Sequence, residues 1–303
     1  MKTSLFHSGA ALLAAVIWGF AFVTQSMGAE VLEPFTVTAV RSVIACVFLG
    51  ILCVVLRKLR REPWSASVAK NPHYLRDLLL GGACCGLALA IATNLQQTGL
   101  ETTTSGKAGF LTAMYIVIVP LFGLALKKPV GRRVWLGVAA AVAGLYFLCI
   151  QEDLSVAMGD VYILLCAVFF SLQILAIDHF VQKVDGVELS LVQTATSAVI
   201  SGVMMFLTET PSLASISLAI WPLMYLGIFS SGVAYTLQIV AQKGSNPAVI
   251  SLLLSLESVF AVIGGALVLG DEMSGREYIG CLLMLAAVVV TQLPEKTPAK
   301  ETK

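Results

Sequence analysis

The feature that most constrains this chain is a series of ten apolar runs, each close to the length that crosses a lipid bilayer. A helix needs about 20 mainly apolar residues to span the hydrocarbon core. The runs cover residues 8-28, 34-56, 77-98, 105-126, 133-150, 160-180, 189-207, 219-241, 247-269 and 277-293. Because unpaired backbone groups are costly in lipid, the runs predict an all-α integral membrane protein with ten transmembrane helices packed as a bundle.

Composition agrees with this interpretation. Of 303 residues, 58 % are apolar and only 12 % are charged, whereas soluble domains carry about 25 % charged residues. The 7 cysteines all fall inside apolar runs without a CxxC pair. They are therefore predicted to be small core residues, not disulfides or metal ligands, and no cofactor or metal is expected. We place the chain in the cell (inner) membrane as a multi-pass protein.

Charge alternates between the connections. Basic residues gather on one side, at Lys2, 57-76, 127-133, Lys183, Lys243 and the tail lysines 296, 300 and 303. Acidic residues gather on the other, at Glu30, Glu33, Glu101, Glu152, Asp153, Asp160, Glu209, Asp271, Glu272 and Glu277. Only Lys107 and Arg276 depart from the pattern. Since basic connections stay in the cytoplasm, both termini are predicted to be cytoplasmic.

The chain also contains an internal repeat. The stretch "RRVWLGVAAAVAGLYF" (132-147) parallels "GREYIGCLLMLAAVVV" (275-290) without a gap. The offset divides the chain into a first repeat (1-151), a second repeat (152-293) and a polar cytoplasmic tail (294-303). Because each repeat holds an odd number of helices, five, the second must be inverted in the membrane relative to the first, a design that places a solute site at the repeat interface.

Several of these segments resemble the drug/metabolite transporter superfamily, in its ten-helix EamA-type branch. The carriers are "IWGFAFV", "TVTAVRSVIACVFL", "TTTSGKAGFLTAMYIVIVPLFGLAL" and "LLLSLESVFAVIGGALVLGDEMS", together with "REYIGCLLMLAAVVV". The resemblance covers nearly the whole chain and implies a central cavity lined by helices 1, 3, 4, 6, 8 and 9. It also implies the proline found at Pro120 and the turn glutamate found at Glu272. The family pattern has proline after the helix 9 glutamate, where this chain has Ser258, so the resemblance gives little support for a helix break there.

Polar and small residues recur at helical spacing along the same helices. The larger ones are the candidate cavity residues: Trp18, Gln25, Gln97, Thr112, Tyr115, Gln173, Tyr235, Gln238 and Gln242. They either line one central pathway or join helices as packing and hydrogen-bonding residues. For the Tyr235, Gln238 and Gln242 face and for Gln97 we favour the cavity, because large amides are poorly suited to close packing. The stripes of small residues, such as 82-86-90-93-97 and Ser251, Ser255 and Ser258, leave both interpretations open.

Two charges lie inside apolar runs, where they are costly and are expected to be functional or paired. Arg41 is predicted to reach the outer side and form a structural or gating ion pair with Glu30 or Glu33. Glu257 leaves three roles open: a neutral carboxyl bonded to a neighbouring helix, the proton carrier of a coupled transporter, or the partner of a cationic solute group. Asp178 and His179, near a helix end, are expected to be solvated residues.

Motifs for other functions are missing from the sequence. It has no Walker A loop, no HExxH and no GxSxG, so ATP-driven transport and enzyme chemistry are not expected, nor is nucleic-acid binding. We therefore expect a secondary transporter that moves small metabolites, such as amino acids or drug-like amphiphiles, by alternating access and in the direction of export. The alternative is a helical membrane protein without a solute pathway. The expected partners are the solute and the lipid bilayer, and the sequence leaves monomer and homodimer open.

Overall fold

The computed structural model describes residues 2–61, 67, 71–103, 105–127, 130–149, 157–268 and 273–292, and the described residues contain helices but no β-strand. The first half holds α1 (Lys2–Ala29), α2 (Pro34–Arg60), α4 (Tyr74–Gly99), α5 (Ser105–Thr112), α6 (Tyr115–Ala125) and α7 (Arg132–Cys149). The second half holds α8 (Met158–Phe180), α9 (Gly186–Thr208), α10 (Leu213–Leu218), α11 (Ile220–Met224), the π-helix η1 (Tyr225–Ala234), α12 (Tyr235–Gln242), α13 (Pro247–Leu254), α14 (Glu257–Val268) and α15 (Gly275–Gln292). The predicted all-helical class is confirmed.

Eight segments are long and apolar enough to cross a membrane. They are Leu5–Ala29, Pro34–Arg60, Tyr74–Gly99, Lys107–Ala125, Met158–Phe180, Gly186–Thr208, Ile220–Gln242 and Pro247–Gly264. Each coincides with one of the predicted spans. The other two predicted spans, 133-150 and 277-293, coincide with the helices α7 and α15, so ten crossings remain a prediction. The predicted repeat boundary at 151 and the acidic residues Glu152, Asp153, Asp271 and Glu272 lie outside the described residues.

The outward faces of the helices are apolar. On α2, Val43, Val47, Ile51 and Val54 are all more than half exposed, and they follow one another at steps of four, four and three residues. Such spacing places them on one side of the helix. A continuous apolar stripe of this size would be unfavourable in water and is what a lipid-facing surface requires.

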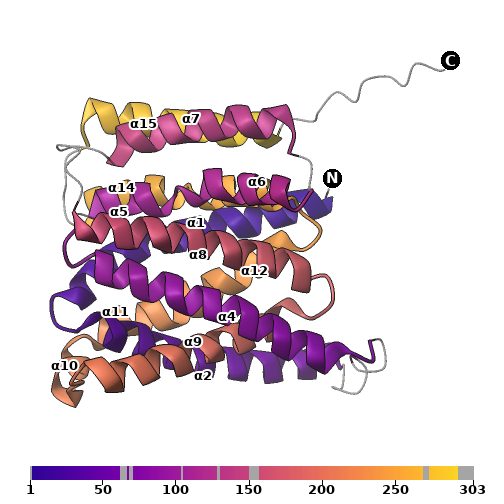
Figure 1. Cartoon of the computed structure of the whole chain (residues 1–303), viewed down its shortest axis with the longest axis vertical. Helices are drawn as coiled ribbons and strands as arrows, with labels where there is room; N and C mark the ends of the chain where they lie inside the picture. The colour runs from indigo at the N-terminus through magenta and orange to yellow at the C-terminus, as the bar shows by residue number, and fades with distance from the viewer. Residues whose placement is uncertain are drawn as a thin grey trace.

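The helices pack in layers (Figure 1). α7 and α15 form a pair at one edge, α2 and α9 lie at the opposite edge, and α1, α5, α6, α8 and α14 lie between them. The α7–α15 pair is close because both helices carry glycine at the contact. A Cβ atom on Gly280 would lie 2.7 Å from the backbone nitrogen of Leu148 and 2.8 Å from the carbonyl oxygen of Gly144. Glycine is therefore required there for the backbones to approach.

Two of the predicted spans are interrupted, and the interruptions match. The bounds of α13 lie 142 residues after those of α5, and Glu257, the first residue of α14, lies 142 residues after Tyr115, the first residue of α6. Both interruptions are tightened turns. The amide of Ile116 donates to the carbonyl of Ala113 at 3.0 Å, and the amide of Ser258 donates to the carbonyl of Ser255 at 3.2 Å. Such i to i+3 bonds often mark hinges inside helices.

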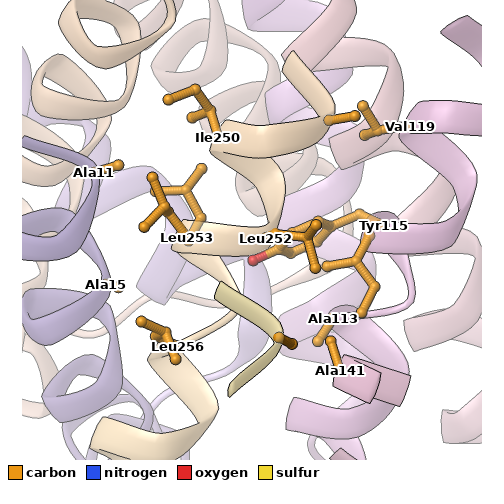
Figure 2. Close-up of a cluster of buried hydrophobic side chains, with 14 of the residues drawn as sticks. Ala11, Ala15, Ala113, Tyr115, Val119, Ala141, Ile250, Leu252, Leu253 and Leu256 are labelled. Atoms are coloured by element: carbon orange, nitrogen blue, oxygen red, sulfur yellow. The ribbon is translucent and has the colours of Figure 1, made fainter. Parts of the chain in front are cut away.

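The prediction that 105-126 and 247-269 are uninterrupted helices is therefore wrong. Pro120 lies inside α6, after the interruption rather than at it. The second interruption forms with Ser258 where the family pattern has proline, so the missing proline does not prevent it. Figure 2 shows the two broken helices facing each other, with Tyr115 and Val119 on one side and Ile250, Leu252 and Leu253 on the other.

Candidate functional site

A cavity of about 40 Å³ lies among the helices, and we call it the central cavity. Side chains from α1, α2, α4, α5, α6, α8, η1, α12, α13 and α14 line it. The resemblance implied helices 1, 3, 4, 6, 8 and 9; Arg41 adds the second helix. The cavity lies deep in the bundle, because Trp18, Tyr115 and Glu257 are each within two residues of the middle of their spans.

Most of the predicted site residues meet at this cavity. Those that line it are Trp18, Gln25, Arg41, Thr112, Tyr115, Gln173, Tyr235, Gln238 and Glu257. Gln97 and Gln242 do not. Gln97 is buried away from the cavity, and neither of its amide atoms has a partner among the described residues. Gln242 is buried, and its amide nitrogen donates to the carbonyl of Ile174 at 3.3 Å.

Two lining residues were missed by the helical spacing. Gln96 lines the cavity and donates to the hydroxyl of Thr112 at 3.1 Å. Steps of three and four from Thr93 reach Gln96 and Gln97 equally well, so spacing alone could not choose between them. Ser230 lines the cavity where the α-helical stripe predicted Ser231. The π-helix η1 explains this shift, since its longer turn puts Ser230, five residues before Tyr235, on the cavity face.

The stripes of small residues mostly serve packing. A Cβ on Gly86 would lie 2.4 Å from the carbonyl oxygen of Gln193, so this face of α4 packs against α9. Ser251 and Ser255 donate to carbonyls of their own helix, those of Ala248 and Leu252. Neither serine lines the central cavity.

Arg41 differs from its prediction. It is 3 % exposed and lines the cavity, and its Nη1 donates to Oε1 of Gln25 at 3.3 Å. Its guanidinium also interacts with the hydroxyl of Tyr235. Within the described residues it forms no ion pair with Glu30, Glu33 or any other carboxylate, so the predicted outer ion pair is wrong. Arg41 lies inside the bundle because polar groups converge there and compensate its burial.

Glu257 is 6 % exposed at the first position of α14 and accepts a hydrogen bond of 3.0 Å from the hydroxyl of Tyr115. Among the described residues, Glu257 and Arg41 are not joined in an ion pair, although both line the cavity. Tyr235 lies between the two charges, close enough for its hydroxyl to interact electrostatically with both. The cavity therefore presents a carboxyl group and a guanidinium to whatever occupies it.

Aromatic and amide side chains complete the walls. The rings of Trp18 and Tyr235 meet edge to face with centroids 4.9 Å apart, and the indole nitrogen of Trp18 donates to the carbonyl of Ser230 at 3.3 Å. Gln238 donates to Gln173 at 3.1 Å, and Gln173 donates in turn to Gln193 at 3.3 Å. The carbonyl oxygen of the Gln238 side chain is buried without a partner among the described residues, which leaves an acceptor available at the cavity.

Catalytic and metal chemistry have little to work with here. No group of three or more His, Cys, Asp or Glu side chains gathers at one place among the described residues. The lining groups are one carboxyl, one guanidinium, amides and hydroxyls, which bind a solute by charge and hydrogen bonding.

The sequence profile of the EamA-like transporter family matches the chain twice, over residues 7–150 and 157–293. The chain belongs to the EamA-like transporter family. This EamA-like transporter is a multi-pass membrane protein and not an enzyme, as the sequence predicted.

The relatives of this EamA-like transporter carry the same general name. An uncharacterized transporter of Archaeoglobus fulgidus is 29 % identical over 283 residues, which cover 93 % of this chain and 84 % of the relative. The uncharacterized inner membrane transporter YedA of Escherichia coli strain K12 is 26 % identical over 301 residues, covering 94 % and 90 %. A protein of known crystal structure is similar in fold, with a TM-score of 0.75 at 19 % identity over 94 % of this chain and 96 % of that one.

Proposed function

We propose that this protein is a secondary transporter that exports small zwitterionic metabolites, with neutral amino acids as the model solutes. The observation that carries the proposal is the presence of Arg41 and Glu257 in one cavity without an ion pair between them. A solute with one carboxylate and one ammonium group satisfies both charges, the carboxylate at Arg41 and the ammonium at Glu257. Trp18 and Tyr235 supply apolar wall for the rest of the solute.

Alternating access is the mechanism we propose. A cavity of about 40 Å³ has room for about two or three water molecules but not for a metabolite, so the solute requires a wider state. The matched interruptions between α5 and α6 and between α13 and α14 supply two flexible points at the cavity wall. Two inverted repeats of five helices, with both termini cytoplasmic, are supported by the double profile match, the charge alternation and the 142-residue offset. The inner membrane is the proposed location, as named for the relative YedA.

The test is flux in proteoliposomes with three related solutes. Leucine carries both charges, N-acetylleucine lacks the ammonium, and leucinamide lacks the carboxylate. We expect saturable flux of leucine and at least a tenfold lower flux of either derivative, because losing one buried charge partner costs 1.4 kcal/mol or more. Vesicles loaded on one side or the other give the direction.

Two variants assign each end of the solute. Arg41→Gln should narrow the gap between leucine and leucinamide, and Glu257→Gln should narrow the gap between leucine and N-acetylleucine. Gln97→Asn is the matched control, since Gln97 is buried but does not line the cavity. Equal flux of all three solutes through the wild type would exclude the zwitterion site and favour a transporter of less polar amphiphiles. No flux of any solute would favour a membrane protein without a pathway.

A further inference from the structure

A second cavity, of about 300 Å³, lies beside the connections that carry the basic residues Lys127, Lys183 and Lys243. We call it the vestibule. It is lined by Val119, Pro120 and Gly123 of α6, by Asp178 of α8, and by 245–248 between α12 and α13. It is several times larger than the central cavity and reaches the size of small-molecule sites. In the proposed topology this end of the bundle faces the cytoplasm.

The vestibule and the central cavity lie along the same helix faces. On α6, Tyr115 lines the central cavity and Val119, four residues on, lines the vestibule. On α8, Ile174 and Asp178 stand in the same relationship. Figure 2 shows Tyr115 and Val119 reaching from α6 toward the same neighbours. Four residues of a helix rise about 6 Å, so roughly one helical turn separates the two cavities.

Ile174 and Gln242 form the layer between the two cavities. Both are at most 2 % exposed, and the Gln242 amide donates to the Ile174 carbonyl at 3.3 Å. Gln242 lies four residues after Gln238 of the central cavity and three before Ser245 of the vestibule. Its side-chain carbonyl oxygen is buried without a partner among the described residues. A buried acceptor left without a donor is unfavourable, so a passing donor group would be stabilised at this point.

The chemistry of the vestibule walls selects a class of solute. Asp178 supplies a carboxylate, and Val119, Pro120 and Pro247 supply apolar surface. Asn246 already caps α13, where its side chain accepts from the amide of Ala248. A carboxylate beside apolar walls suits an ammonium group attached to an apolar body. Asp178 was expected to be merely solvated at a helix end; its position in this cavity gives it a binding role.

We infer that the vestibule is a second solute site, where the ammonium group binds near Asp178 before the solute passes Gln242 into the central cavity. This inference rests on the proposed function. It assigns Asp178 to selection and Gln242 to the gate, and it explains why an exporter has its larger cavity at the cytoplasmic end.

Gly123 makes the vestibule testable without disturbing the fold. A Cβ on Gly123 meets nothing within 4 Å although the residue is buried, so a side chain there projects into the cavity. Gly50 of α2 has equally open space but lies outside the vestibule, which makes it the matched control. In proteoliposomes, Gly123→Phe should reduce leucine flux at least tenfold, whereas Gly123→Ala and Gly50→Phe keep most of it. Undiminished flux through Gly123→Phe would overturn the vestibule as part of the pathway.

A thiol-labelling measurement tests charge selection without transport. Gly123→Cys is introduced after the 7 native cysteines are replaced by alanine. The purified protein is labelled with cationic aminoethyl or anionic sulfonatoethyl methanethiosulfonate, and exposed Ser217→Cys serves as reference. Attraction to the carboxylate should raise the cation-to-anion rate ratio at Gly123→Cys roughly fivefold above the reference. Asp178→Asn should remove that excess.

The outcomes separate this inference from the proposed function. Equal ratios at both positions, or no labelling at Gly123→Cys, would overturn the vestibule site whatever the flux. A raised ratio that persists in Asp178→Asn would overturn the role of Asp178. A raised ratio that Asp178→Asn removes, in a protein that moves no solute, would support the site and contradict transport.

Discussion

The hydroxyl of Tyr115 donates a hydrogen bond of 3.0 Å to Oε1 of Glu257, and the two residues begin α6 and α14, the second parts of the two broken helices. They lie 142 positions apart, as do the helices that precede them. The bond thus joins the two halves of the chain at the centre of the bundle, between equivalent points. A widening of the central cavity that separates α6 from α14 has to break it.

The strength of this contact can be measured by a double-mutant cycle. Tyr115→Phe and Glu257→Gln should each lower the free energy of unfolding in detergent. The two effects should be coupled by about 0.6 kcal/mol, the usual value between membrane helices, and by no more than about 1.7 kcal/mol. Thr112→Val with Glu257→Gln is the control cycle, because Thr112 accepts from Gln96. Additive effects in the Tyr115 cycle would show that the bond contributes nothing to stability.

Proton coupling is the second prediction. Glu257 is the one carboxyl group that lines the central cavity among the described residues, so it is the candidate carrier of a coupled proton. With an imposed pH gradient across proteoliposomes, wild-type leucine flux should be driven against its concentration gradient. Glu257→Gln should retain only passive exchange. Gradient-driven accumulation by Glu257→Gln would assign the carboxyl group to structure or to solute binding instead.

The apolar runs of the sequence predict the helices well, because the requirement for backbone pairing in lipid is strict and local. The candidate cavity residues were also found by their spacing, except where the spacing itself changes. Ser230 replaced Ser231 because η1 is a π-helix, and nothing in its composition distinguishes it from the α-helices around it. Gln96 and Gln97 were indistinguishable since both satisfy the helical period.

Long-range contacts were the part that the sequence could not supply. Arg41 was expected near Glu30 or Glu33, its neighbours along the chain, but it bonds Gln25 and interacts with Tyr235 across the bundle. The vestibule depends on α6, α8 and the connection before α13 meeting in space. The tightened turn at Ser255 and Leu256 forms without the proline that the family pattern uses.

The contact between α7 and α15 gives the third prediction. Gly280→Ala would place a Cβ within 2.8 Å of two backbone atoms, and backbone cannot move aside as a side chain can. Overpacking of this kind should lower the free energy of unfolding by about 1–3 kcal/mol. Gly275→Ala is the matched control at the start of the same helix, since a Cβ there meets nothing within 4 Å. Thermal unfolding in detergent measures both, and equal melting temperatures would contradict the close contact.

The two cations that departed from the charge alternation each have a partner in the structure. The guanidinium of Arg276 lies over the rings of Tyr146 and Phe147, with centroid distances of 5.1 and 5.7 Å. The Nζ of Lys107 lies 2.5 Å from Oδ2 of Asp160. These local partners account for basic residues at the acidic end, so the exceptions do not weaken the proposed topology.

The Lys107–Asp160 pair carries the last prediction. Asp160 also accepts from the hydroxyl of Thr103 at 3.0 Å and from the amide of Ala157 at 2.8 Å, so it joins the end of α4, the start of α5 and the start of α8. Lys107→Met leaves this carboxylate buried without its cation. The loss should be about 2 kcal/mol, below the 3–5 kcal/mol of fully buried pairs because the Lys107 side chain is 22 % exposed.

Unfolding measurements on three variants check this value. Lys183→Met, at an exposed lysine, is the control and should change stability by less than about 0.5 kcal/mol. The double variant Lys107→Met with Asp160→Asn should lose less than the two single variants together, because the unpaired charge is then absent. If Lys107→Met proves as mild as the control, the ion pair does not stabilise the junction of α5 and α8, and the hydrogen bonds from Thr103 and Ala157 suffice to hold Asp160 in place.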